Sequence, residues 1–279
     1  MNGIVQNVVA INRDHHERAS HCRHCQSCMK KPVCPAYELV SGQQLDGESG
    51  MLQKTIQPGQ SVFRASDKFD GIYMVRSGFF KSFFIDADGV MQVTGFHFPG
   101  EIFGIDGIET GFYNDSVEAL DTGSICKIPL SLFTGSPARK SSIGSDNLLN
   151  LSEYNMNGIS RMVPLMKIMS RTISRDRNMI FALGKLCAKR RLGTFLLDIS
   201  ARMAQSGYDA NQLHLFMSRT DISNYLCLAL ETISRLFAQL HAENIISVDR
   251  RDIKILNMPA LQALVRDDAT SESALAQTA

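Results

Sequence analysis

The sequence predicts an α+β protein with an N-terminal β-roll of the jelly-roll kind, a long helix, and a C-terminal winged helix-turn-helix. Three observations lead to this fold class. Short aromatic and β-branched runs separated by turn residues fill residues 51–133. A stretch with apolar residues at alternating intervals of three and four follows it. Two short helical patterns then lead into two β runs, and 279 residues leave room for two separate cores.

The composition argues against several classes of protein. Hydrophobic residues make up 44% of the chain and charged residues 20%, with a formal net charge of +1, so any basic surface must be local. No apolar run approaches the roughly 18 residues that a membrane-spanning helix needs. Residues 14–18 are polar or charged where the apolar core of a signal peptide would continue. We therefore expect a cytoplasmic protein that binds no membrane.

The β-roll is predicted from four strand-forming runs, GIYMVRSG, FFKSFFI, VMQVTGFHF and GSICKIPLSLF. Residues 86–89 form a hairpin turn between two of them, because glycine takes positive φ without penalty. The Ser-, Gly- and Pro-rich residues 134–147 predict a loop. The chain then divides into a cysteine-rich segment 1–37, the β-roll domain with its loop 38–150, a dimerisation helix 151–185, the winged helix-turn-helix 186–259, and a tail without structure 260–279.

The long helix carries a stripe typical of a coiled-coil seam. The stripe consists of Met166, Met169, Ile173, Asp176, Ile180 and Leu183. Pro164 is expected in the first turn, or as a kink just before the stripe. The stripe could face the chain's own domains, but a lone carboxylate in a permanent core would be costly. In a parallel homodimer Asp176 would meet its own copy, and the like charges would weaken association. The stripe thus predicts a homodimer that a signal can strengthen or release.

Residues 218–255 predict the winged helix-turn-helix. A first short helix is expected to be capped by Thr220 or Asp221, whose side-chain oxygens can accept backbone N–H groups. After a break at residues 227–229, a second helix begins near Leu230 or Glu231, and two β runs joined by residues 249–252 follow. The second helix is apolar on one face and polar in its first turns, at Glu231, Thr232, Ser234 and Arg235.

These side chains suit the reading of double-stranded DNA. In the major groove, Arg can bind guanine O6 and N7, Glu can accept from cytosine N4, and Ser or Thr can reach bases or phosphates. Arg250, Arg251 and Lys254 on the wing are expected to anchor phosphates. The alternative is a helical bundle whose polar face is simply solvated.

Four of the seven cysteines lie within thirteen residues, at Cys22, Cys25, Cys28 and Cys34. In a reducing compartment, such clusters are metal ligands or redox centres more often than disulfides. The short Cys-x-x-Cys steps suit an iron–sulfur cluster as well as a zinc ion, which His21 and His24 could also bind. Either all four cysteines hold one metal centre, or three of them act together with a distant fourth.

The segment YLCLALETISRLFAQL resembles the recognition-helix region of the CRP/FNR superfamily of bacterial transcription regulators, and its ETISR string resembles the FNR branch. The resemblance extends to IYMVRSGFFKSF, QVTGFHFPGEIFG and GSICKIP, and covers nearly all of the chain from the cysteines to about Pro259. It implies that Glu231, Ser234 and Arg235 read a palindrome of TTGAT-like half-sites. It also implies that exposed β-roll loops, among them IDADGVMQ, contact RNA polymerase.

The resemblance also implies a cofactor. FNR proteins hold a [4Fe–4S] cluster with Cys-x2-Cys-x5-Cys near the N-terminus and one cysteine of the β-roll. The matching ligands are Cys25, Cys28, Cys34 and Cys126, with Cys22 as a spare that could substitute for one of them. Cys187 and Cys227 are expected to be buried apolar residues. The implied protein is an oxygen-sensing regulator, mainly an activator of anaerobic genes, that dimerises on DNA while the cluster is intact.

A cyclic nucleotide, the best-known ligand of the superfamily, is not expected. The superfamily uses a Gly-Glu pair for the ribose and Arg-Ser about ten residues later for the phosphate. Gly100 and Glu101 keep the first pair, but no Lys or Arg lies between Glu101 and Cys126. A cyclic phosphate would therefore meet acidic residues without a countercharge.

Two other functions fit part of the pattern. A zinc-stabilised member of the same superfamily would not respond to oxygen. An electron-transfer protein is the second, because Cys-x2-Cys-x2-Cys followed by Cys-Pro is similar to bacterial ferredoxins. The gap from Cys28 to Cys34 is longer than the ferredoxin step, however, and an electron carrier needs no helix-turn-helix. No nucleophile–base motif or phosphate loop indicates an enzyme.

Overall fold

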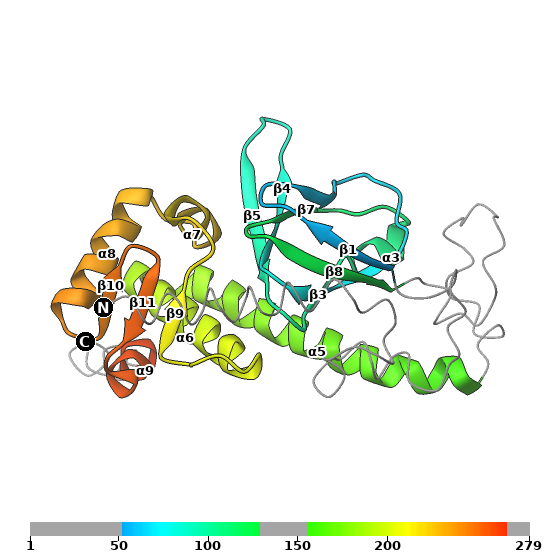
Figure 1. Cartoon of the computed structure of the whole chain (residues 1–279). Coiled ribbons are helices and arrows are strands. Elements are labelled where there is room, and N and C mark those ends of the chain that lie inside the picture. Colours follow the sequence, from blue (N-terminus) through cyan, green and yellow to red (C-terminus); the bar gives the residue numbers. More distant parts are fainter. Residues whose placement is uncertain (1–51, 129–155, 267–279) are drawn as a thin grey trace, which may run out of the picture. The chain divides into compact units, whose positions relative to one another are not determined.

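The computed structural model describes residues 52–128 and 156–266, which are coloured in Figure 1. The chain divides into two compact units, one up to Ile173 and one from Ser174 on. The cysteine-rich segment, the loop predicted at 134–147 and residues 267–279 lie outside the described residues. Among the described helices, none combines the length and the apolar character needed to cross a bilayer.

The first unit is a β-roll of two four-stranded antiparallel sheets, as the sequence predicts. Each of the four predicted runs contains a strand. One sheet has the order β1 (Leu52–Ile56), β8 (Gly123–Ile128), β3 (Ile72–Ser77) and β6 (Ile102–Phe103). The other has the order β2 (Ser61–Phe63), β7 (Ser116–Ala119), β4 (Phe80–Ile85) and β5 (Met91–His97). A short helix, α3 (Gly107–Thr110), precedes β7.

Aromatic side chains fill the core of the β-roll. The rings of Phe63 and Tyr113 stack with their centroids 3.7 Å apart, and those of Tyr73 and Phe103 stack at 5.6 Å. Such pairs contribute roughly 0.5–1.5 kcal/mol beyond the area they bury. The predicted hairpin turn between β4 and β5 is confirmed. Its glycine, Gly89, has a φ of 78°.

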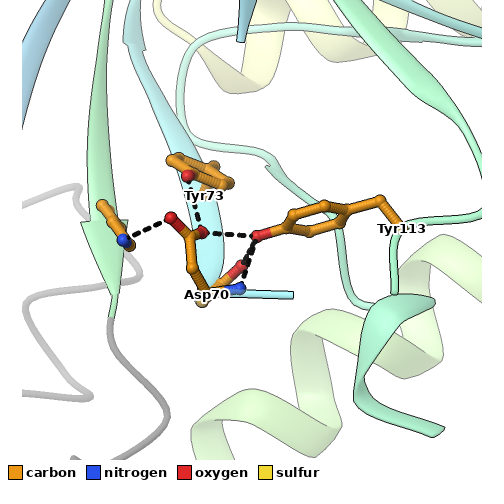
Figure 2. Close-up of polar contacts among 5 residues, drawn as sticks. Asp70, Tyr73 and Tyr113 are labelled. Atoms are coloured by element: carbon orange, nitrogen blue, oxygen red, sulfur yellow. Dashed lines mark hydrogen bonds and ion pairs between the residues drawn. The ribbon is translucent and has the colours of Figure 1, made fainter. Parts of the chain in front are cut away.

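A polar network ties the start of β3 to β8 (Figure 2). The carboxylate of Asp70 accepts hydrogen bonds from the hydroxyls of Tyr73 at 2.8 Å and Tyr113 at 2.7 Å. Its second oxygen pairs with the ammonium of Lys127 at 2.6 Å, which lies on β8. Burial alone would raise the pKa of Asp70, but the hydrogen bonds from these three partners outweigh it and hold that pKa below its ordinary value.

The second unit is a winged helix-turn-helix, again as predicted. Helix α6 (Ala188–Gln205) packs against α8 (Leu230–Ala242) and α9 (Met258–Arg266), while α7 (Arg219–Tyr225) precedes α8. The wing is a three-stranded sheet of β10 (Ile246–Asp249), β11 (Asp252–Ile255) and β9 (Gln212–His214). This sheet and α8 are adjacent in Figure 1, and α8 contacts β10 directly.

Helix α9 occupies residues where the sequence predicts the start of an unstructured tail. Leu261 is completely buried, and a guanidinium nitrogen of Arg190 on α6 donates to the carbonyl of Val265 at 2.6 Å. The sequence-based boundary is placed too early, because the polar residues after Arg266 suggest an unstructured tail. The burial of Leu261 extends the ordered chain to Arg266.

The long helix, α5, spans Met156–Lys185 and contributes to both units. Pro164 lies inside the helix, beyond the first turn that was one of its two expected places, and two residues before the stripe begins at Met166. Leu165 belongs to the core cluster of the β-roll, and Ile168 and Met169 pack against that cluster. The early part of α5 is therefore fixed by the β-roll of its own chain.

Asp70→Asn should lower the melting temperature at pH 7, because the amide loses the ion pair with Lys127. The folded pKa of Asp70 is depressed, so its contribution to stability is present above the ordinary value of about 4 and is lost as the pH falls through the folded pKa. Thermal unfolding of both proteins at pH 7 and in steps below pH 4 measures this. Asp88→Asn, on the exposed hairpin, is the control. A melting-temperature gap that stays constant into acid would contradict the role of the carboxylate.

Candidate functional site

The helix-turn-helix begins with a capping box. Ser218 is the N-cap of α7: its hydroxyl accepts from the Asp221 N–H at 3.0 Å, and the Asp221 carboxylate accepts from the Ser218 N–H at 2.9 Å. The prediction that Thr220 or Asp221 caps this helix is therefore wrong by two or three residues. Asp221 instead takes the third helical position, where its carboxylate reaches back to the cap. The Ser-x-x-Asp spacing was the signal for this arrangement.

The turn between the two helices lies at the predicted break. Cys227 has a φ of 52°, and the N–H of Leu228 donates to the carbonyl of Ser223 at 2.9 Å. Cys227 is exposed, and so is Cys187, the N-cap residue of α6. The expectation that both cysteines are buried is therefore wrong. Each lies where the chain turns at a helix end, and neither lies on an apolar face.

Helix α8 presents one apolar and one polar face, as predicted. Its buried side chains are Ile233, Leu236, Phe237 and Leu240. Glu231, Ser234 and Arg235 are exposed on its first turns, and Thr232 is half-buried. The hydroxyl of Ser234 donates to the carbonyl of Leu230 at 3.0 Å, which leaves its acceptor side available. Within the described part of the chain, no salt bridge engages Arg235.

The wing places its two arginines at a tight turn. The register of β10 with β11 pairs Asp249 with Asp252, so Arg250 and Arg251 alone connect the strands. Both arginines are exposed, as is Lys254 on β11. Arg250 has a φ of 54°, the positive value that hairpin turns of this length use at their first position.

Cys126 lies on β8 and is the one predicted cluster ligand within the described residues. It pairs with Gln53 of β1 on one side and Met74 of β3 on the other. The residue is half-buried and packs against the core cluster of the β-roll. A ligand needs this combination of rigid support and partial access. The described residues contain no group of three or more His, Cys, Asp or Glu that could hold a metal ion, and Cys22, Cys25, Cys28 and Cys34 lie outside them.

The retained Gly-Glu pair forms a turn of the β-roll. Gly100 has a φ of 91°, and the N–H of Glu101 donates to the carbonyl of Phe98 at 3.0 Å. The Glu101 carboxylate accepts from the N–H of Phe98 at 3.0 Å. This carboxylate therefore closes its own turn.

Three apolar residues of the predicted stripe on α5, spaced seven residues apart, are exposed. Met166, Ile173 and Ile180 have exposed fractions of 60%, 54% and 69%. Asp176, which lies between the last two, has 58% of its side chain exposed and lies 3.9 Å from Arg175. Leu183 is half-buried, and Met169 packs against the β-roll of its own chain.

Comparison with known proteins agrees with this geometry. A Crp-like helix-turn-helix domain matches residues 190–264, and a cyclic nucleotide-binding domain matches residues 53–135. The transcriptional activator protein Anr of Pseudomonas protegens is 34% identical, over 88% of this chain and 94% of that protein. The fumarate and nitrate reduction regulatory protein of Salmonella typhi is 35% identical, over 86% of this chain and 90% of that protein.

This chain belongs to the CRP/FNR family of transcription regulators. Among solved structures, FixK2 from Bradyrhizobium japonicum matches this CRP/FNR chain with a TM-score of 0.62 and 25% identity, over 77% of this chain and 96% of that one. A transcriptional regulator of the CRP family from Thermus thermophilus shares the fold, with a TM-score of 0.55 and 14% identity, over 76% of this chain and 96% of that one. The chain is therefore a DNA-binding transcription regulator and not an enzyme.

Ser218→Ala should lower the free energy of unfolding of this CRP/FNR regulator by about 1 kcal/mol, because α7 loses its N-cap. Urea unfolding monitored by circular dichroism measures the change. Thr220→Ala is the matched control, because its exposed side chain takes no part in the capping box; it should change the free energy by less than about 0.5 kcal/mol. A larger loss for Thr220→Ala than for Ser218→Ala would contradict the assigned cap.

Proposed function

We propose that this CRP/FNR regulator senses oxygen through a [4Fe–4S] cluster held by Cys25, Cys28, Cys34 and Cys126. When bound, the cluster supplies an oxygen-sensitive link between the N-terminal segment and β8. The observation that carries the proposal is Cys126, which β8 holds half-buried between two hydrogen-bonded strands. The spacing of the three N-terminal cysteines and the relatives named for fumarate and nitrate reduction support it.

Contacts of the β-roll core support a route from Cys126 to α5. Cys126 packs against the same core cluster as Ile168 and Met169 of α5. A change in the packing of Cys126 can therefore alter the packing of α5 through that core, because close-packed interiors transmit strain. We infer that the cluster acts on the α5 stripe by this route.

The homodimer forms along the exposed stripe of α5. Met166, Ile173 and Ile180 are large apolar side chains that a second copy would remove from water, at roughly 25 cal/mol per Å² buried. Asp176 lies among them, and its carboxylate would approach the partner copy's. Repulsion between the two charges offsets part of the apolar gain, so the two states differ by a small free energy that a cluster can reverse.

Dimerisation prepares the protein to read DNA. A two-fold axis brings the two α8 helices to successive major grooves, about 34 Å apart. Glu231, Ser234 and Arg235 then read the bases of a palindrome with TTGAT-type half-sites, and Thr232 contacts a phosphate. Arg250 and Arg251 of the wing hold the phosphates beside each half-site.

Activation of transcription requires a contact with RNA polymerase. The β4–β5 hairpin exposes Phe84, Ile85 and Val90, which suits this contact. The relatives' names describe transcriptional activators, so we infer that activation of anaerobic genes is the main output.

The protein acts in the cytoplasm, where the DNA is. Without a cation between Glu101 and Cys126, it binds no cyclic nucleotide.

Cys126→Ala should prevent cluster formation and lower DNA affinity under anoxia, because one of four ligands is lost. Anaerobic absorption spectra, iron and acid-labile sulfide assays, and binding to a TTGAT palindrome measure the effect. Cys187→Ala is the matched control: this cysteine is exposed and lies outside the β-roll, so its removal should leave a full cluster. A full cluster in Cys126→Ala would refute the ligand assignment.

Asp176→Ala should give dimers in air, because the paired carboxylates no longer oppose the apolar contact. Sedimentation velocity of aerobically purified protein measures the oligomeric state. Arg177→Ala, an exposed neighbour outside the stripe, is the control and should remain monomeric in air. If Asp176→Ala is also monomeric in air, charge repulsion does not keep the subunits apart.

A further inference from the structure

Arg219, the first residue of α7, is held inside the DNA-binding unit. The carbon at the centre of its guanidinium lies 3.4 Å from the ring centroid of Phe237 on α8. One terminal nitrogen, Nη2, donates to the carbonyl of Arg250 in the wing turn at 3.3 Å. The other, Nη1, is buried and has no hydrogen-bond partner among the described residues. One side chain therefore connects the first helix, the recognition helix and the wing.

This placement costs free energy. Burial lowers the pKa of Arg219 to about 10, so the guanidinium remains charged near pH 7 although part of its hydration is lost. The ring of Phe237 compensates in part through a cation–π contact. An arginine that only attracts phosphates could remain flexible in water and would not need to stack on Phe237.

The wing turn depends on contacts of this kind. Arg250 has a φ of 54°, which is unfavourable for a residue with a side chain. The turn is held by its neighbours in the chain before α7. The N–H of Leu215 donates to the carbonyl of Arg251 at 2.8 Å, and His214 Nδ1 lies 2.6 Å from the carboxylate of Asp252. The wing strand β10 is joined to α8 by a hydrogen bond from the N–H of Val248 to His241 Nδ1 at 3.2 Å. Arg219 adds a contact from the turn itself to the ring of Phe237 on α8.

We propose that Arg219 is a positioning residue for DNA binding. By stacking on Phe237 and donating to the Arg250 carbonyl, it fixes the wing arginines at one distance from the recognition helix. Base contacts from α8 and phosphate contacts from the wing are then made together, without a further loss of conformational freedom on binding. The inference rests on the DNA-binding function of the family and on the wing contacts proposed above.

A double-mutant cycle of Arg219→Met and Arg251→Ala tests this role. Methionine keeps the length and the apolar contact with Phe237 but cannot donate to Arg250. Full-length wild type, both single variants and the double variant are purified under anoxia, and the active fraction is measured by stoichiometric titration. Affinity is then measured against salt on a TTGAT palindrome, on the palindrome with one changed base pair per half-site, and on a scrambled duplex.

We expect Arg219→Met to lower the affinity for the palindrome about tenfold. It should also reduce the dependence of log affinity on log salt concentration, as Arg251→Ala does, by about 1 for each phosphate that the wing no longer binds. Adding Arg251→Ala to Arg219→Met should then cost less than about twofold more, because the wing is already displaced from the phosphates. The penalty for the changed base pair should equal that of wild type, since α8 is still in place.

Three results would overturn the proposal. Losses that multiply in the double variant would mean that Arg219 binds DNA independently of the wing. A reduced base-pair penalty in Arg219→Met would mean that α8 itself has moved. An unchanged salt slope would mean that the wing does not depend on Arg219. If wild type does not prefer the palindrome, the operator proposal fails, and the slopes on the scrambled duplex still decide the role of Arg219.

Discussion

In the proposed mechanism, regulation depends on the exposed apolar stripe of α5. Met166, Ile173 and Ile180 lie on one line of the helix, while Leu165, one residue earlier, is fixed in the β-roll core. The helix therefore has one face that its own chain covers and one that remains in water. Asp176 interrupts the exposed face, so that covering it with a second copy gains apolar contact and brings like charges together. The proposed cofactor could decide between monomer and dimer only if the difference between these two effects is small.

In the same proposal, the β-roll is the rigid support through which the cluster acts on α5. Cys126 and the start of α5 pack on the same core cluster, and the next residue of β8, Lys127, is tied to Asp70. A ligand on a loop would absorb a pull from the N-terminal segment by moving. If Cys126 on β8 is a ligand, as proposed, it would transmit that pull to a close-packed core instead. In the second unit, the role proposed for Arg219 is comparable: its contacts with Phe237 and Arg250 would keep the wing turn at a set distance from α8.

Elements with strong local signals could be predicted from the sequence. The β-roll strands, the start of α8 and the two β runs of the wing all follow from side-chain periodicity and turn chemistry. The wing turn is two residues shorter than the predicted connection 249–252, because Asp249 and Asp252 pair in the sheet. Predictions from the sequence were wrong for features that depend on a few individual contacts. Ser218 caps α7 through one pair of hydrogen bonds, and α9 is held by the burial of Leu261 and one hydrogen bond from Arg190. The stacking of Arg219 on Phe237 has no periodicity in the sequence, so only the fold brings these residues together.

The proposed oxygen response of the cluster is tested on one anaerobic sample, measured before and after exposure to air. Absorption spectra, iron and sulfide content, and sedimentation velocity are recorded together with binding to a TTGAT palindrome. We expect a brown protein with about four iron and four sulfide per chain that sediments as a dimer and binds DNA. In air, this protein should lose its colour, its dimeric state and its DNA binding. An iron-free, colourless protein from strict anoxia that still dimerises and binds the palindrome would contradict the proposed response.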